Sequence, residues 1–424
     1  MQTAGLGTLT TEGKLPRERS DFNHVFIVLG GINVRRSLIT YIPEGGWEMM
    51  QENDDYEMLR LAMNKKTSAK LPKHKAVTEL LKSIFSEEEV KLLRAFKTTG
   101  EPLSDEEISQ LSGVPKDEVN KIFSDMAYKG KLLKIENSFI IMPLFPGLFE
   151  FYFTNNRDAP EKMKRAALAH RELFYAGHHF ELSAGKYATF RVIPTVEPTL
   201  KTIELNKSIQ VERRVLPYEV LKDYLSQTSP YVLVPCSCRT AAKYTGHPCK
   251  KTDENFCFAT GSLALLTIAN GVGREVNFDE LLEIMKKAEK AGLVHETINT
   301  QEPSMFICNC CPDCCGFLKS VKEFQNYGAI TKSNFSPRID KNLCNKCEIC
   351  MEKCPMEAIY HHFPHSEDAS DDMMIIRENH CIGCGVCASN CPISAITLEK
   401  VRNEVPVETQ AEVEQKVRGA ERVH

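Results

Sequence analysis

Eight cysteines near the end of the chain form two copies of one spacing pattern. Each copy reads C-x2-C-x2-C-x3-C-P, and the second follows the first after 37 residues. A C-x-x-C turn aims successive sulfurs at a common centre, so three thiolates at this spacing can hold one cubane [4Fe–4S] cluster. The fourth cysteine, on the short helix that follows, can reach a second cluster. Zinc sites usually combine two separate C-x2–4-C pairs instead, so the pattern predicts two [4Fe–4S] clusters. The repeated residues are Cys344, Cys347, Cys350, Cys354 and Pro355 in the first copy, and Cys381, Cys384, Cys387, Cys391 and Pro392 in the second.

The two copies differ in glycine content. Gly383 and Gly385 in the second copy let the backbone curl close to a cluster, so that its N–H groups can point at the sulfides. Such hydrogen bonds stabilise the charge that is added on reduction. The first copy has Lys346 and Glu348 at the same positions. We therefore expect the two clusters to differ slightly in potential.

Residues Pro337–Lys400 resemble the two-cluster ferredoxins of bacteria, with all eight cysteines and both prolines in place. The resemblance implies a ferredoxin-like fold of two βαβ repeats, electron transfer at low potential, and an exchange of the fourth cysteine between the repeats. The ligands that it implies are Cys344, Cys347, Cys350 and Cys391 for cluster 1, and Cys381, Cys384, Cys387 and Cys354 for cluster 2.

The link between the two copies departs from that pattern. It contains 26 residues, among them HHFPHSEDASDDMM, which is expected to form an inserted, charged hairpin. The hairpin is more typical of a solvated loop than of a partner site. We expect His361, His362 and His365 to lie on the surface rather than to bind metal.

Nine further cysteines lie between residues 236 and 315. Clustered cysteines in a chain without an export signal suggest metal ligands rather than disulfides. One or two additional [4Fe–4S] clusters, a zinc site made from part of the set, and a reactive site with an unusual cluster all remain open. Four ligands per site would leave one cysteine over. In chain order the cysteines form a candidate third site at Cys236, Cys238, Cys249 and Cys257, and a candidate fourth site at Cys308, Cys310, Cys311, Cys314 and Cys315, with Cys311 or Cys315 the expected spare.

Arg239 directly follows Cys238 and is a candidate supporting residue for a cluster. Its guanidinium could offer positive charge to a nearby thiol or donate to a cluster sulfide. A helix-cap or salt-bridge contact is an equally good interpretation of its position.

Residues 190–400 are similar to multi-cluster iron–sulfur proteins of anaerobic bacteria and archaea. The stretches that carry the similarity are PCSCR, GREVNFDELLEIMKKAEKAGLVH and FICNCCPDCC. The similarity implies a redox function and does not identify a substrate.

The elements that must position the cysteines change in type along the chain. Capping boxes at Ser86–Glu89 and Ser104–Glu107 predict the starts of two helices. The order of helices and a hairpin over residues 76–153 resembles a winged-helix domain. An amphipathic helix is predicted over Asn277–Gly292, between the two groups of central cysteines.

These elements predict an α+β protein of several domains. We expect a disordered tail (1–20), an N-terminal domain (21–153) with the winged-helix-like segment (76–153), a connecting segment (154–230), a cysteine-rich α/β metal-binding domain (231–330), a ferredoxin-like domain (337–400) and a polar tail (401–424).

Composition and charge disfavour nucleic acid and membranes as partners. The net charge is −4, the first twenty residues contain no apolar signal segment, and no run of 18 apolar residues exists, so we expect a cytoplasmic protein. From Glu87 to Glu136 there are eleven acidic and eight basic residues, and the candidate recognition helix begins with Asp117 and Glu118. Acidic residues at that position repel phosphates, which favours protein docking over DNA binding.

The sequence therefore predicts an iron–sulfur electron-transfer protein that serves a larger anaerobic oxidoreductase, with a flavoprotein or reductase as partner. Two alternatives stay open: a redox-sensing regulator that binds DNA through the winged helix, and an oxidoreductase with its own active site at the central cysteines. We find no nucleophile–base constellation, no P-loop and no dinucleotide fingerprint, so an internal flavin or NAD site is not supported.

Overall fold

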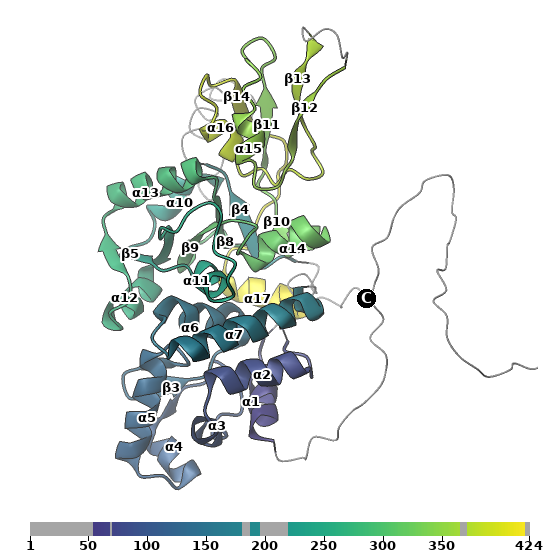
Figure 1. Cartoon of the computed structure of the whole chain (residues 1–424). Helices are drawn as coiled ribbons and strands as arrows, with labels where there is room; N and C mark the ends of the chain where they lie inside the picture. Colours follow the sequence, from purple (N-terminus) through teal and green to yellow (C-terminus); the bar gives the residue numbers. More distant parts are fainter. Residues whose placement is uncertain (1–53, 68–69, 180–186, 196–218, 365–370, 420–424) are drawn as a thin grey trace, which may run out of the picture. The chain divides into compact units, whose positions relative to one another are not determined.

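The computed structural model describes residues 54–67, 70–179, 187–195, 219–364 and 371–419 (Figure 1). All of them belong to Gln51–His424, one of the two units into which the chain divides. Helices and strands together give the mixed content that the sequence predicted for an α+β protein. The tail expected at residues 1–20 lies outside the described residues.

The N-terminal elements combine short helices with a small sheet. Strand β3 lies between β1 and β2 and is antiparallel to both, so the predicted hairpin is confirmed as β2–β3. The elements are α1 (Asp55–Met63), α2 (Lys75–Ile84), α3 (Glu87–Leu93), β1 (Leu103–Ser104), α4 (Asp105–Ser112), α5 (Lys116–Tyr128), β2 (Leu133–Ile135) and β3 (Ser138–Ile140).

Side-chain caps begin two of these helices, as predicted. At the start of α3 the Ser86 hydroxyl accepts a hydrogen bond from the Glu89 N–H at 3.2 Å, and the Glu89 carboxylate accepts one from the Ser86 N–H at 2.7 Å. Ser104 and Glu107 form the same reciprocal pair at the start of α4. Each pair satisfies N–H groups that have no partner within the helix.

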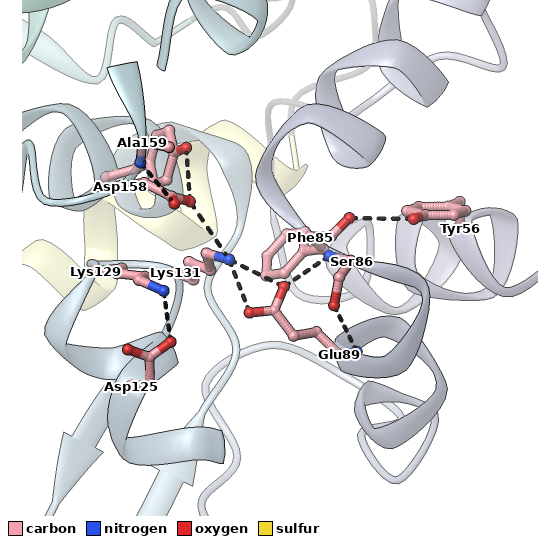
Figure 2. A network of polar contacts seen from close by, with 10 residues as sticks. Tyr56, Phe85, Ser86, Glu89, Asp125, Lys129, Lys131, Asp158 and Ala159 are labelled. Atoms are coloured by element: carbon pink, nitrogen blue, oxygen red, sulfur yellow. Dashed lines mark hydrogen bonds and ion pairs between the residues drawn. The ribbon is translucent and has the colours of Figure 1, made fainter. Parts of the chain in front are cut away.

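A buried ammonium group joins this region to the helix that follows. The Lys131 side chain is 1% exposed, and its Nζ lies 2.8 Å from Glu89 Oε1 and 3.5 Å from Asp158 Oδ2 (Figure 2). The Tyr152 hydroxyl donates to the same Asp158 oxygen at 3.2 Å. Two carboxylates thus compensate one buried cation, and Glu89 does so while it also caps α3.

The segment that follows contains a helix rich in basic residues, α7, and a strand, β4. Helix α7 packs against α2, and β4 enters the central sheet. The elements are η1 (Leu144–Leu148), α6 (Phe149–Asn155), α7 (Pro160–Leu173), η2 (Phe174–His178), β4 (Phe190–Ile193) and α10 (Leu221–Leu225).

The cysteine-rich part is built on a seven-stranded sheet in the order β10-β4-β8-β9-β6-β5-β7, in which β10 and β4 are parallel and the other neighbours antiparallel. The predicted amphipathic helix is α13, capped by the Asn277 side chain and ended by Gly292 at φ +85°. The elements are β5 (Tyr231–Val234), α11 (Ser237–Tyr244), β6 (Cys257–Thr260), α12 (Gly261–Ala269), β7 (Arg274–Val276), α13 (Phe278–Ala291), β8 (Val294–Ile298), β9 (Phe306–Cys310), α14 (Gly316–Phe324), η5 (Tyr327–Ala329) and β10 (Ile330–Thr331).

The C-terminal elements repeat as strand, short helix and strand. Strands β11 and β14 pair antiparallel, and so do β12 and β13, which are the stem of the inserted hairpin predicted between the two cysteine motifs. The elements are β11 (Phe335–Ile339), α15 (Ile349–Lys353), β12 (Ile359–His362), β13 (Met373–Ile376), α16 (Val386–Ser389) and β14 (Ile396–Lys400).

The end of the chain packs against the central sheet. Helix α17 (Gln410–Gly419) lies in the segment expected to be a polar tail, and Val407 and Val413 are buried with Ile298 of β8. Among the described helices, none combines the length and the apolar composition needed to cross a bilayer.

Candidate iron–sulfur and metal centres

The ferredoxin-like part contains two cavities, each lined by four cysteines. In each cavity three cysteines come from one repeat and the fourth from the other, which is the exchange that the ferredoxin resemblance implies. Cavity 1 is lined by Cys344, Cys347, Cys350 and Cys391, and cavity 2 by Cys354, Cys381, Cys384 and Cys387.

The short helices produce this exchange. Cys354 directly follows α15, Cys391 follows α16, and the two helices pack against each other. The Ala358 N–H donates to Cys354 Sγ at 3.2 Å, and the Ala395 N–H donates to Cys391 Sγ at 3.2 Å. N–H donors stabilise a thiolate, and a thiolate is the form of cysteine that binds a metal. These hydrogen bonds therefore favour metal binding by Cys354 and Cys391, the two cysteines that are exchanged between the repeats.

Matching loop positions of the two repeats adopt the left-handed backbone. The angle φ is +72° at Gly383 and +60° at Lys346, and +79° at Gly385 and +61° at Glu348. A Cβ on Gly383 would lie 2.3 Å from the Phe335 carbonyl oxygen, so only glycine fits there. In the first repeat Lys346 and Glu348, which are not glycines, adopt the same left-handed conformation, and this strains the backbone.

The donor set fits iron–sulfur clusters. Burial raises the pKa of the Cys350 thiol to about 11 and holds the pKa of Cys387 well above its usual range. Buried thiols at these positions form thiolates readily only when a bound cation compensates their charge. Cys347 is exposed. Cavity 1 therefore lies close to the protein surface at Cys347.

His361 lies beside cavity 1 rather than on the open surface where we expected it. Its side chain is 12% exposed, and its Nδ1 lies 2.6 Å from Oε1 of Glu348, which lines cavity 1. Its neighbour His362 is exposed, as expected. His365 lies outside the described residues.

Strand pairing decides which central cysteines meet. In the sheet β6 lies between β5 and β9, and β9 also pairs with β8, where Cys308 is opposite Glu296. Side chains alternate along a strand, so Cys308 and Cys310 share one face with Glu296. Asn309 and its cross-strand partner His295 face the other side.

Six cysteines and one carboxyl group form what we call the central group. Thiol contacts link Cys236 to Cys238 and Cys257, Cys257 to Cys308, Cys308 to Cys310, and Cys310 to Cys315. Glu296 Oε2 lies 3.7 Å from Cys315 Sγ, and Glu296, Cys310 and Cys315 are all buried with ligand atoms within 4.8 Å of one another. The group thus consists of Cys236, Cys238, Cys257, Cys308, Cys310, Cys315 and Glu296.

The other three central cysteines form a separate three-cysteine group. The sulfurs of Cys249, Cys311 and Cys314 all lie within 4.8 Å of one another, and those of Cys249 and Cys311 are 3.4 Å apart. Backbone N–H groups of Lys251 and Thr252 point at the Cys249 sulfur. Contacts with the Cys311 and Cys314 thiols lower the pKa of Cys249, and these backbone N–H groups lower it further.

The structure divides the nine cysteines differently from their order in the chain. Cys249, expected with the first set, lies with Cys311 although 62 positions separate them. Cys257, also expected with the first set, lies against Cys308 because β6 and β9 are neighbours. Cys311 and Cys315, the expected spares, each belong to a group.

Arg239 lies beside the central group as a buried cation. Its Nη1 donates to the Asn309 carbonyl oxygen at 2.9 Å, and its Nη2 donates to Cys257 Sγ at 3.8 Å. Burial opposes the charged form of this guanidinium, but the thiolates of Cys257 and Cys236 raise its pKa above the usual value. These contacts place the positive charge at the thiols and do not form an ordinary carboxylate salt bridge.

The sequence analysis did not predict Glu296 as a site residue. It also did not predict a buried network of polar side chains on the other face of β8. His295 Nδ1 lies 2.5 Å from Asn309 Oδ1, and His295 Nε2 lies 3.0 Å from Glu289 Oε1. Ser389, in α16 of the ferredoxin-like part, donates to Glu289 Oε2 at 2.9 Å. The available signal was the run of polar residues inside the fully buried strand VHETI.

One apolar core is shared by the central group and cavity 2. Cys310 and Cys315 are buried in this core, and Cys381 and Cys384 pack against it. Cys354 packs both against this core and against the neighbouring core around cavity 1. Continuous side-chain packing therefore links the central group, cavity 2 and cavity 1 in that order.

Comparison with known proteins bears on the C-terminal cysteines. A family model described as a 4Fe-4S dicluster domain matches residues 343–395. No match was found among curated proteins or among solved structures. The C-terminal part of the chain is thus a ferredoxin-type 4Fe–4S dicluster domain, and it supports an iron–sulfur electron-transfer role for the protein.

Proposed function

We propose that the protein transfers electrons between an iron–sulfur cluster at the central group, two clusters in the C-terminal domain, and an external redox partner. Each [4Fe–4S] cluster, when bound, supplies reversible one-electron chemistry. The observation that carries the proposal is the apolar core that holds the central group and cavity 2 together. The proposed ligands are Cys344, Cys347, Cys350 and Cys391 for cluster 1, Cys381, Cys384, Cys387 and Cys354 for cluster 2, and four of the six central-group cysteines for the third cluster.

The surface around cavity 1 is the proposed docking site of the partner. Cys347 is exposed there. Ile393 of the cavity lining is 40% exposed, and Leu343, which directly precedes Cys344 in the chain, is 57% exposed. Apolar side chains around an exposed ligand suit the small interfaces of transient redox complexes. The partner chemistry is that of a flavoprotein or a larger reductase in an anaerobic cytoplasm, where thiols stay reduced.

Hydrogen bonds hold cavity 2 beside the central sheet. The Thr195 N–H donates to the Cys384 carbonyl oxygen at 3.0 Å, and Asn390 Nδ2 donates to the Glu289 carbonyl oxygen at 2.8 Å. Fixed spacing between cluster sites suits electron transfer because it removes the need for domain movement before each step.

Removing cluster 2 tests the proposed order of electron transfer, in which cluster 2 lies between cluster 1 and the central cluster. In the full chain with Cys384→Ser, we expect a reduced flavoprotein to reduce cluster 1 at the wild-type rate and the central cluster at least tenfold more slowly, as followed by freeze-quench EPR. Lys346→Gly changes a cavity-1 loop, keeps every cysteine, and serves as the control. Unchanged reduction of the central cluster in Cys384→Ser would contradict the proposed order.

A redox-sensing DNA-binding regulator is the second candidate. Helices α4 and α5 and the β2–β3 hairpin keep the order that resembles a winged helix. However, Asp117 and Glu118 lie in the first turn of α5, and Lys116 lies 3.6 Å from Asp105. That end of α5 therefore offers little positive charge to a phosphate. Tight, salt-sensitive binding of the full chain to fluorescent duplex DNA that changes with oxidation state would favour the regulator.

An oxidoreductase with its own active site is the third candidate. The observation in its favour is Glu296 Oε1, a buried oxygen with no hydrogen-bond partner among the described residues, next to the thiols of the central group. Carbon monoxide or cyanide that shifts the EPR signal of the central cluster, and no other signal, would favour this function.

A further inference from the structure

The three-cysteine group has the spacing of ligands to one ion. Its three sulfurs lie within 4.8 Å of one another, with 3.4 Å between Cys249 and Cys311. Thiolates that share one tetrahedral ion at a metal–sulfur distance of about 2.3 Å lie roughly 3.8 Å apart. The observed spacing agrees with that value.

A cubane cluster requires a wider spacing. Each of its thiolates binds a different iron and points outward, so the sulfurs are farther apart than around a single ion. The ferredoxin-type domain provides a reference within the same chain. Within the described ranges, two sets of three ligand atoms come within 4.8 Å of one another, and neither contains any of the eight cysteines of cavities 1 and 2. The second set, Glu296 with Cys310 and Cys315, contains only two sulfurs, so no three sulfurs of the central group, whose residues are all described, are as close together as those of the three-cysteine group.

Local structure fixes the three sulfurs before any ion binds. Cys311 and Cys314 belong to one tight turn after β9, in which the Cys314 N–H donates to the Cys311 carbonyl oxygen at 3.3 Å. Cys249 comes from the loop between α11 and β6, and the Lys250 N–H of that loop donates to Asp313 Oδ2 of the turn at 3.3 Å. A C-x-x-C turn with one distant cysteine is a ligand arrangement typical of zinc sites.

The geometry points to a mononuclear zinc-type site, and we propose that Cys249, Cys311 and Cys314 bind one tetrahedral Zn²⁺ ion. In the described residues no histidine or carboxylate ligand atom joins the three sulfurs. Asp313 instead accepts from Lys250. The fourth position is therefore open to water or to a small anionic ligand, as in zinc sites that keep three protein ligands.

Zinc has no redox chemistry, so this ion lies outside the electron path. It ties the loop that leads into Cys257 of β6 to the turn between β9 and α14. The same two segments supply three thiols of the central group, Cys257, Cys310 and Cys315. The ion thus holds these two segments together, keeps an exchangeable ligand at its fourth position, and leaves six thiols for the third cluster.

Metal analysis of the full chain, purified anaerobically from medium that contains iron and zinc, tests the proposal. We expect one zinc per chain, loss of that zinc in Cys314→Ser with unchanged iron, and loss of about four irons with unchanged zinc in Cys344→Ser. Zinc-edge X-ray absorption on the wild-type protein should show three sulfurs at about 2.3 Å and one lighter ligand.

Loss of iron rather than zinc in Cys314→Ser would overturn the proposal, and so would a wild-type protein without zinc. If Cys314→Ser does not fold, the wild-type absorption spectrum decides, because four sulfurs or none would contradict an open three-cysteine site. The electron-transfer proposal is tested separately by the iron lost in Cys344→Ser, so the two can fail independently.

Discussion

Glu296 and Cys308 face each other across the ladder between β8 and β9, with Glu296 Oε1 buried and unpartnered among the described residues. This pairing places one carboxyl group among six thiols. A buried polar atom without a partner is rare in native proteins and costs free energy. A bound cluster or a proton-carrying role would account for its presence.

Replacement of this carboxyl group should change the central cluster alone. Burial, reinforced by the negative charge of Cys238, raises the pKa of Glu296 to about 8. Above pH 8, where this carboxyl group is ionised, we expect Glu296→Gln to raise the reduction potential of the third cluster, because less negative charge then opposes the added electron. A redox titration followed by EPR should show unchanged potentials for clusters 1 and 2. Glu275→Gln, at an exposed position of β7, is the matched control. A shift in all three signals would point to a general structural effect instead.

The glycine requirement differs between the two repeats. We expect Gly383→Ala to prevent cluster binding in cavity 2, because the added Cβ would clash with the Phe335 carbonyl oxygen. The iron content should then fall by about four irons per chain. Lys346→Gly relieves a left-handed backbone and should change the free energy of unfolding by less than about 1 kcal/mol. Iron analysis and thermal unfolding measure both outcomes. Full iron content in Gly383→Ala would show that the loop tolerates the added Cβ.

The buried cation in the N-terminal elements should be important for stability. Lys131→Met leaves the Glu89 and Asp158 carboxylates without their partner and should lower the free energy of unfolding by about 3–5 kcal/mol. Lys129→Met removes the more exposed pair with Asp125 and should cost less than about 1 kcal/mol. Urea unfolding at neutral pH measures both. Equal effects would mean that Lys131 is not the residue that compensates these charges.

The stability of the fold around α7 and η2 should fall in mild acid. Burial, aided by the charge of His179, lowers the pKa of His178 to about 4, although a hydrogen bond to the Lys70 backbone opposes the shift. Between pH 4 and 6.5 the unfolded chain therefore binds a proton that the folded chain does not, and stability decreases as the pH falls through this window.

The variant His178→Phe should weaken that dependence. Hydrogen exchange of α7 amides at pH 5 and pH 7 measures it, after correction for intrinsic rates. Some dependence should remain, because burial also lowers the pKa of His170, to about 3. His247→Gln, at an exposed position, should behave as the wild type. An unchanged pH dependence in His178→Phe would show that other groups cause it.

Local patterns could be read directly from the sequence. The capping boxes at Ser86 and Ser104 involve residues three apart, and the structure contains both. The ferredoxin motif is also local, because each set of three cysteines spans seven residues, and the resemblance to two-cluster ferredoxins implies where the fourth belongs. The family match over residues 343–395 agrees with that interpretation.

The central cysteines could not be sorted from the sequence because their neighbours are set by strand register. The antiparallel pairing of β8 with β9 puts Glu296 opposite Cys308, and the position of β6 beside β9 brings Cys257 to the same place. A shift of the register by one residue would turn Cys308 and Cys310 to the opposite face. Nothing in the spacing of the cysteines determines that register.

An EPR-monitored redox titration of the anaerobically purified full chain, combined with iron and sulfide analysis, tests the electron-transfer account most directly. We expect three clusters that take up and release electrons reversibly, with about twelve irons per chain. We also expect that serine at four of the six central-group cysteines, tested one at a time, abolishes one signal and leaves the two C-terminal clusters intact. About eight irons, with central cysteines that react as free thiols, would contradict the account.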